Sequence, residues 1–130
     1  MAQAAATPER DSPSALEART LAQRAKAAAP HLAEFTQDQI DRIVGAVAAA
    51  AAPCAETFAR MAVEETGFGV VADKIEKNRF AAERVYEFIR PMRTVGVIRR
   101  EEERKVIEIA VPFGVVAAIV PSTNPTSTAI

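Results

Sequence analysis

The sequence has very few of the side chains that form disulfides or bind metals. Its 130 residues include one cysteine, Cys54, and one histidine, His31. A single cysteine cannot form an internal disulfide, which is consistent with a reducing compartment. No group of histidine, cysteine and carboxylate residues has the spacing of a metal site, so the sequence predicts no bound metal. We expect His31, which follows a proline, to be a loop residue.

Long apolar runs are also lacking. No run reaches the roughly 18 residues that a membrane span needs, and the N-terminus lacks the basic and apolar regions of a secretory signal. A net charge of -1 and a pI of about 5.9 do not indicate a nucleic-acid partner. We therefore expect a cytoplasmic protein with no membrane partner and no nucleic-acid partner.

Alanine and charge are distributed unevenly. Alanine supplies 28 of the 130 residues, so the hydrophobic fraction of 49% overstates the core, because an alanine buries little apolar area. The last charged residue is Glu108, and residues 109–130 carry no charge at all. Such a stretch is unusual at a free terminus. We expect the chain to be a piece of a longer polypeptide whose other part covers this stretch.

The N-terminal region has two predicted parts. Residues 1–13 have no periodicity and are expected to be a disordered tail. A capping box formed by Ser14 and Glu17 then predicts a helix over residues 14–29, which ends before Pro30.

Three further helices are predicted up to Pro91. The first begins at a capping box of Thr36 and Gln39 and places apolar residues at the spacing of one buried face. A proline separates it from the second, which Gly67 ends. The third has the clearest helical period, with Asp73 and Lys77 paired outside its apolar stripe.

After these helices the spacing becomes that of β-strands. Residues 94–99 are β-branched, residues 105–111 alternate between two faces, and the charged segment between them is typical of an exposed turn. We expect the two segments to pair as an antiparallel hairpin. Residues 115–120 are a continuous apolar run, which is typical of a strand buried on both faces of a sheet.

A polar loop and the start of a helix follow this run. The loop is Pro121, Ser122, Thr123 and Asn124, and Pro125 suits the first position of a helix. In open α/β sheets, ligands bind at the carboxyl ends of strands, near such helix starts, so we predict a ligand site here. Asn124 has two alternative roles: it could cap the helix or donate an amide hydrogen bond to a developing oxyanion.

Two other motifs are interpreted as structural. Gly67, Gly69 and Ala72 match the G-x-G-x-x-A pattern of a dinucleotide fingerprint, but a helix precedes them where the fingerprint requires a strand. We interpret Gly67 as the end of that helix. Cys54 lies near a helix N-terminus, a position that favours a reactive thiolate. No base is available to activate it, so we interpret it as structural.

Several separated blocks resemble one family. GVVAAIVPSTNPTSTAI at residues 114–130 is similar to the signature of CoA-acylating aldehyde dehydrogenases, especially the acetaldehyde dehydrogenase part of bifunctional aldehyde-alcohol dehydrogenases. AVEETGFGVVADKIEKN at residues 62–78 and TVGVI at residues 94–98 extend the resemblance over residues 14–130. The resemblance implies an α/β fold with N-terminal helices, a β-hairpin and the first strand, loop and helix of a Rossmann-like domain.

The resemblance also implies a division of the chain. Residues 14–91 would be the helical N-terminal part of a cofactor domain, and residues 92–112 a β-hairpin through which a homo-oligomer forms. Residues 113–130 would be the start of a parallel NAD-binding sheet.

The activity implied by the resemblance is NAD-dependent and acylating. In this family a cysteine thiolate attacks the aldehyde, hydride passes to NAD, and the thioester is transferred to coenzyme A. Asn124 matches the asparagine that holds the oxyanion, a catalytic role. Val120, Pro121, Ser122 and Thr123 would lie along the nicotinamide side of NAD.

Several alternatives accompany this resemblance. Acetaldehyde is the expected substrate, and sulfoacetaldehyde and succinate semialdehyde are alternatives. A non-acylating aldehyde dehydrogenase is less favoured, because the loop has Ser-Thr before Asn124 where those enzymes have an aromatic residue. The family's nucleophilic cysteine comes after this region, so Cys54 is not assigned that role and the chain alone is expected to be inactive. A non-catalytic interaction module that binds through its strands is the alternative from another class.

Overall fold

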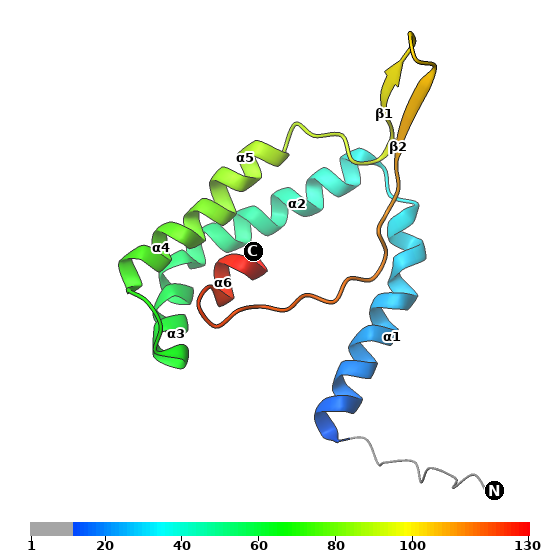
Figure 1. The fold of residues 1–130 in the computed structure, drawn as a ribbon. Helices are drawn as coiled ribbons and strands as arrows, with labels where there is room; N and C mark the ends of the chain where they lie inside the picture. The colour runs from blue at the N-terminus through cyan, green and yellow to red at the C-terminus, as the bar shows by residue number, and fades with distance from the viewer. Residues whose placement is uncertain (1–11) are drawn as a thin grey trace, which may run out of the picture. The chain divides into compact units, whose positions relative to one another are not determined.

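The computed structural model of the protein describes residues 12–130 (Figure 1). The tail predicted for residues 1–13 lies outside this range except for its last two residues. The described chain divides into two compact units. One comprises the described residues up to Glu34 together with Pro112–Val116, and the other comprises Phe35–Val111 together with Ala117–Ile130. The domain boundaries suggested by the family resemblance stay a prediction.

The first helix begins earlier than predicted. α1 (Pro13–Ala33) follows Ser12, whose hydroxyl accepts a hydrogen bond of 3.3 Å from the backbone N–H of Ala15. Ser12 is therefore the N-cap, and the predicted capping box of Ser14 and Glu17 is wrong. The proline after Ser12 occupies the first helical position, where its missing N–H costs no hydrogen bond.

The same helix also ends later than predicted. α1 continues through Pro30 to Ala33, so the predicted end before Pro30 is wrong. No residue of α1 is buried, and the carbonyl that Pro30 leaves without a helical partner can face water. His31 therefore lies in the last helical turn, and the expectation that it is a loop residue is wrong.

The other helices follow their predicted signals closely. Thr36 and Gln39 form both hydrogen bonds of the capping box, and the left-handed Gly67, with φ of 71°, ends a helix as predicted. The predicted third helix of this group is continuous but contains a wider π-helical segment. In chain order the elements are α2 (Gln37–Ala51), the 3-10 turn η1 (Ala52–Cys54), α3 (Ala55–Thr66), α4 (Val71–Arg79), the π-helical η2 (Phe80–Val85) and α5 (Tyr86–Ile89).

The apolar core of the described chain consists of small side chains. α3 packs against α4, and α2 packs against η2 and α5 (Figure 1). The buried apolar residues are all alanines. These alanines are Ala48, Ala55, Ala59, Ala62 and Ala82. Larger apolar side chains on the predicted buried face of α2 stay exposed, to 44% at Ile43 and 51% at Val47, so that part of the prediction is wrong.

One helical run has the length and composition of a membrane span. The run is Gln37–Thr66, which comprises α2, η1 and α3. It is weak evidence for a membrane location, since a core helix of a soluble protein passes the same test. Within this run, α3 packs against α4. The expectation of no membrane partner stays a prediction.

The predicted hairpin forms. β1 (Gly96–Glu101) and β2 (Val106–Ala110) pair as antiparallel strands, with a bulge between Val97 and Arg99. At the base of the hairpin, the backbone N–H groups of Thr94 and Val95 donate to Oε1 of Gln37, at 2.8 and 3.0 Å. The first turn of α2 therefore anchors the chain as it enters β1.

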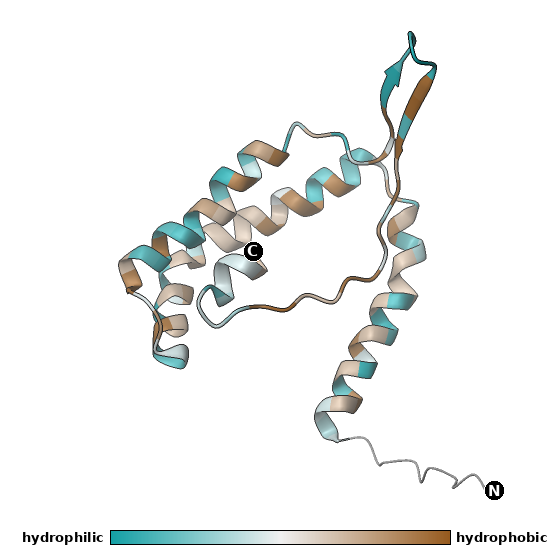
Figure 2. Cartoon of the chain, viewed as in Figure 1, coloured by the Kyte–Doolittle hydropathy of each residue, from teal (hydrophilic) through white to brown (hydrophobic). Residues whose placement is uncertain are grey.

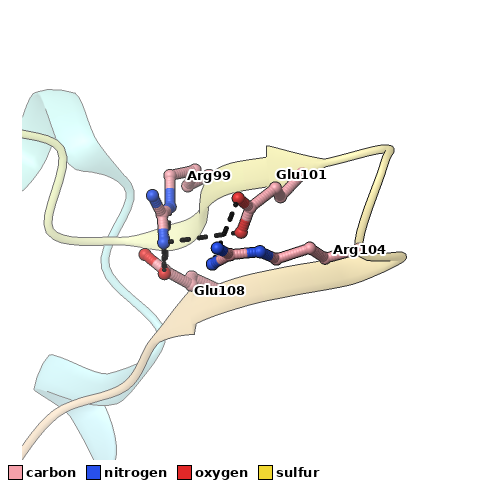
Figure 3. Close-up of polar contacts among 4 residues, drawn as sticks. All are labelled: Arg99, Glu101, Arg104 and Glu108. Carbon is pink, nitrogen blue, oxygen red and sulfur yellow. Dashed lines mark hydrogen bonds and ion pairs between the residues drawn. The ribbon is translucent and has the colours of Figure 1, made fainter.

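Ion pairs extend along the hairpin, whose charged turn is exposed as predicted. Figure 3 shows Arg99 on β1 next to Glu108 on β2, where its Nε donates to Oε1 of Glu108 at 2.9 Å. Glu101 lies 3.9 Å from Nη2 of Arg99 and 3.5 Å from Nη1 of Arg104. All of these pairs are at least partly exposed, so each contributes little to stability.

The strand predicted for residues 115–120 is absent. No helix or strand is assigned to residues 111–120, and their side chains are exposed, to 95% at Ile119. Figure 2 shows this segment as a largely apolar connection after β2. A buried strand needs a neighbour for its N–H and C=O groups. In residues 12–130 only β1 and β2 pair, so no described segment supplies that neighbour.

The capping box at the start of α2 provides a test of the helical unit. We expect Thr36→Ala to lower the free energy of unfolding by about 1 kcal/mol, because the substitution leaves an N–H group of the first turn without an acceptor. Chemical denaturation followed by circular dichroism measures this change. Thr20→Ala is the matched control, because Thr20 lies inside α1, where alanine is the better helix former. Equal losses for the two variants would contradict the role of Thr36.

Candidate functional site

The predicted helix start at Pro125 is confirmed, but Asn124 does not cap the helix with its side chain. α6 (Pro125–Ala129) has Asn124 at its N-cap position without a side-chain capping bond. Its Oδ1 instead accepts a hydrogen bond of 3.0 Å from Nζ of Lys77. Of the two alternative roles for Asn124, the capping role is therefore wrong. The amide is directed towards α4.

Three polar side chains on one face of α4 hold the loop and the start of α6. Lys74 donates from Nζ to the carbonyl of Thr123 at 2.8 Å, and Lys77 donates to Asn124. Asn78 accepts from Oγ1 of Thr126 at 2.7 Å. The spacing i, i+3 and i+4 places the three side chains together on the helix. The loop is therefore fixed at its backbone, at its amide and at the following helix.

Asn78 is the most deeply buried of these three residues. It is 1% exposed, and its Nδ2 donates to the backbone carbonyl of Ala55 at 3.0 Å while its Oδ1 accepts from Thr126. One amide thus connects the start of α3, the end of α4 and the first turn of α6. Both ends of the amide are satisfied, as a buried polar group requires.

The side chain of Lys74 explains why position 69, which belongs to the G-x-G-x-x-A pattern, is a glycine. Lys74 is 5% exposed, and a Cβ added to Gly69 would lie 3.1 Å from its Cε. Gly69 also has a φ of 82°, which other residues rarely adopt. The interpretation of this pattern as structural is confirmed, since Gly67 ends α3 and Gly69 makes room for the side chain of Lys74.

An open groove of about 630 Å³ lies beside Asn124. Its walls combine apolar side chains of η2 with polar side chains of α4 and α6, which suits a small molecule with one polar end. The lining residues are Glu76, Lys77, Phe80, Ala81, Val85, Asn124, Ser127 and Thr128.

The four predicted cofactor contacts lie outside this groove. Val120, Pro121, Ser122 and Thr123 are exposed, and none of them lines it. Their role in binding NAD stays a prediction.

The other candidate residues do not form part of this site. Cys54 is half-buried in the turn before α3 and does not line the groove. Within residues 12–130, no group of three or more histidine, cysteine or carboxylate residues could hold a metal ion.

Sequence reasoning missed the three loop-holding residues of α4. The expected pairing of Lys77 with Asp73 does not occur in the described chain, and Lys77 contacts Asn124 instead. A signal was present, because Lys74, Lys77 and Asn78 share one helical face. The sequence alone does not show which segment covers that face, because the partners of the three residues in the loop and α6 lie 47 to 49 residues away in the chain.

Comparison with known proteins supplies the family. No family model matches the sequence. The bifunctional aldehyde-alcohol dehydrogenase AdhE of Escherichia coli is 46% identical over 114 residues, which are 88% of this chain and 13% of AdhE. A crystal structure of an acetylating aldehyde dehydrogenase from Geobacillus thermoglucosidasius matches with a TM-score of 0.83 and 56% identity, over 87% of this chain and 25% of that one. The chain belongs to the acylating aldehyde dehydrogenase family.

Family membership confirms the resemblance and the α/β fold class. Another relative, the acetylating succinate-semialdehyde dehydrogenase of Clostridium kluyveri, is 41% identical over 108 residues, which are 83% of this chain and 24% of that enzyme. The chain therefore spans between about an eighth and a quarter of the length of these three relatives.

The buried amide of Asn78 provides a test of how the loop is held. We expect Asn78→Ala to lower the free energy of unfolding by about 3 kcal/mol, because it leaves the Ala55 carbonyl without its donor and removes the acceptor of Thr126. Thr126→Val keeps its shape and loses one hydrogen bond, so its loss should be about 1 kcal/mol. Denaturant unfolding of both variants measures the two values. A loss for Thr126→Val as large as that for Asn78→Ala would contradict the central role of Asn78.

Proposed function

We propose that this chain forms the oxyanion-binding part of an NAD-dependent, CoA-acylating aldehyde dehydrogenase that oxidises acetaldehyde. The observation that supports the proposal is the amide of Asn124, which Lys77 holds at the edge of an open groove. The residue stands where the family resemblance places the oxyanion-holding asparagine.

The chemistry of an amide suits this role. A side-chain amide donates hydrogen bonds without exchanging a proton, so it stabilises a developing negative charge throughout the reaction. Oδ1 of Asn124 is engaged by Lys77, while Nδ2 has only Thr123 Oγ1 nearby, at 3.5 Å. An amide nitrogen carries two N–H donors. One donor is therefore available to a carbonyl oxygen of the substrate.

In the proposed reaction, a cysteine thiolate adds to the carbonyl carbon of the aldehyde. The carbon–sulfur bond forms as the π electrons of the carbonyl move to its oxygen, and Asn124 stabilises the resulting oxyanion. The oxyanion would then re-form the C=O bond as a hydride leaves the same carbon, which gives a thioester. NAD would supply the hydride acceptor, and transfer of the acyl group to coenzyme A would release the cysteine thiolate. We do not assign the thiolate to Cys54, which lies outside the groove. We propose that these 130 residues are inactive without a further cysteine.

Charges at the groove favour an uncharged aldehyde over an anionic one. Among the described residues that line the groove, Lys77 is the only cation, and it already donates to Asn124. Glu76 lies on the same wall and would repel a carboxylate or a sulfonate. Succinate semialdehyde and sulfoacetaldehyde are therefore the second choices.

The chemistry of NAD and coenzyme A and the single cysteine agree with a cytoplasmic location.

An assay of the product of the complete reading frame tests the proposed reaction. We expect NADH to form from acetaldehyde and NAD in the presence of coenzyme A. Asn124→Ala should lower kcat by about 10² to 10³, because the oxyanion loses a donor, while the Kd for NAD stays unchanged. The control is Gln23→Ala, which removes an exposed amide from α1. NADH formation at the same rate without coenzyme A would exclude an acylating enzyme.

The hairpin supports a proposal about assembly. β1 and β2 form a sheet of two strands, whose outer edges have no partner among residues 12–130. Ile107 and Ile109 lie on one face of β2 and are 51% and 61% exposed. An exposed edge with apolar side chains is a surface for strand or face pairing. We therefore propose that the hairpin binds a second copy of the protein, a role that a non-catalytic interaction module would share.

Sizing of a hairpin variant tests this assembly. We expect Ile109→Glu to shift the protein to a smaller species in light scattering, because a carboxylate would have to be buried in the interface. Glu103→Gln, in the exposed turn of the hairpin, should leave the size unchanged. An Ile109→Glu variant of unchanged molar mass would exclude the hairpin as the interface.

A further inference from the structure

In the hydrogen bond between Lys77 and Asn124, Lys77 can only be the donor. A lysine ammonium has three hydrogen-bond donors and no acceptor, so the amide atom that faces it has to be the oxygen. Nζ of Lys77 lies 3.0 Å from Oδ1 of Asn124. This contact favours one of the two flipped orientations of the Asn124 amide, in which Nδ2 is turned away from Lys77.

The orientation matters because the two ends of an amide have nearly the same shape and opposite polarity. With Nδ2 towards the substrate, Asn124 donates to the oxyanion. After a flip of 180°, Oδ1 would face the oxyanion and two negative oxygen atoms would repel each other. The neighbouring hydroxyl of Thr123 cannot decide between the orientations, because a hydroxyl both donates and accepts.

We propose that Lys77 is a positioning residue that keeps the N–H donors of Asn124 directed towards the reacting carbonyl oxygen. This inference rests on the proposed function, because it gives Lys77 a role in the same oxyanion site. Lys77 acts through Asn124 and need not touch the substrate. Its positive charge also polarises the amide that it contacts, which strengthens Nδ2 as a donor.

Other contacts of α4 separate this role from the folding of the loop. Lys74 holds the carbonyl of Thr123, and Asn78 holds the hydroxyl of Thr126, on either side of Asn124. Lys77 is exposed, whereas Lys74 and Asn78 are buried. Removal of the Lys77 ammonium therefore leaves the loop backbone and the start of α6 held by their own hydrogen bonds.

The neighbouring carboxylate does not compete for Lys77. Glu76 forms an ion pair with Arg79, with 3.5 Å between Oε1 of Glu76 and Nη1 of Arg79. The ammonium of Lys77 is thus directed to Asn124 by the helix face on which it lies.

Substitutions of Lys77 in the product of the complete reading frame test the inference. Glutamine can both donate and accept, so Lys77→Gln removes the preference for one orientation. We expect kcat to fall by about 10- to 100-fold, which is less than the loss for Asn124→Ala, while the Kd for NAD and the melting temperature stay unchanged. Lys77→Arg keeps a group that only donates and should recover most of kcat. Lys26→Gln makes the same change on exposed α1 and serves as the control.

A double variant shows whether Lys77 acts through Asn124. If it does, Lys77→Gln should cause no further loss of kcat in protein that already carries Asn124→Ala, because the group to be positioned is gone. Two losses that multiply in the double variant would overturn the inference. So would a Lys77→Gln variant with wild-type kcat in an enzyme that Asn124→Ala inactivates. A wild-type protein without aldehyde-dependent formation of NADH would instead overturn the proposed function and this inference with it.

Discussion

The described structure depends on one buried amide. Asn78 donates to the backbone of α3 and accepts from the first turn of α6, so it joins segments that lie 23 and 48 residues away in the chain. Asn78 itself is 1% exposed, and its hydrogen bond to Ala55 is buried, whereas the bond from Thr126 is partly buried. These hydrogen bonds fix the position of α6 relative to α3 and α4. The position of α6 in turn fixes the position of the loop that precedes it.

The same helix face performs three separate tasks. Asn78 fixes the helix that follows the loop, Lys74 fixes the loop backbone, and Lys77 reaches the loop side chain that is proposed to act on the substrate. The two residues that hold the structure, Lys74 and Asn78, are buried. Lys77, which contacts Asn124, is exposed and lines the groove. A site built on a helix in this way holds its donor more precisely than a free loop would.

Local signals predicted most of the fold. The capping box at Thr36 and the end of a helix at Gly67 were found correctly, because the neighbouring residues determine both features. The strand at residues 115–120 was not, because a strand exists only where another segment pairs with it. For the proposed site, the resemblance suggests Asn124, whereas no sequence signal pairs Lys77 and Asn78 with their partners, because those partners are remote in sequence.

The alanine core has a consequence for variation in this family. Where α3 and α4 meet, methyl groups of residues such as Ala59 and Ala62 set the spacing between the helices. A larger side chain there would push α4 outward, and α4 carries the contacts to the loop. Such substitutions would displace the proposed oxyanion site without touching any residue that lines the groove. Natural variants with altered activity should therefore be sought at these buried alanines as well as around the groove.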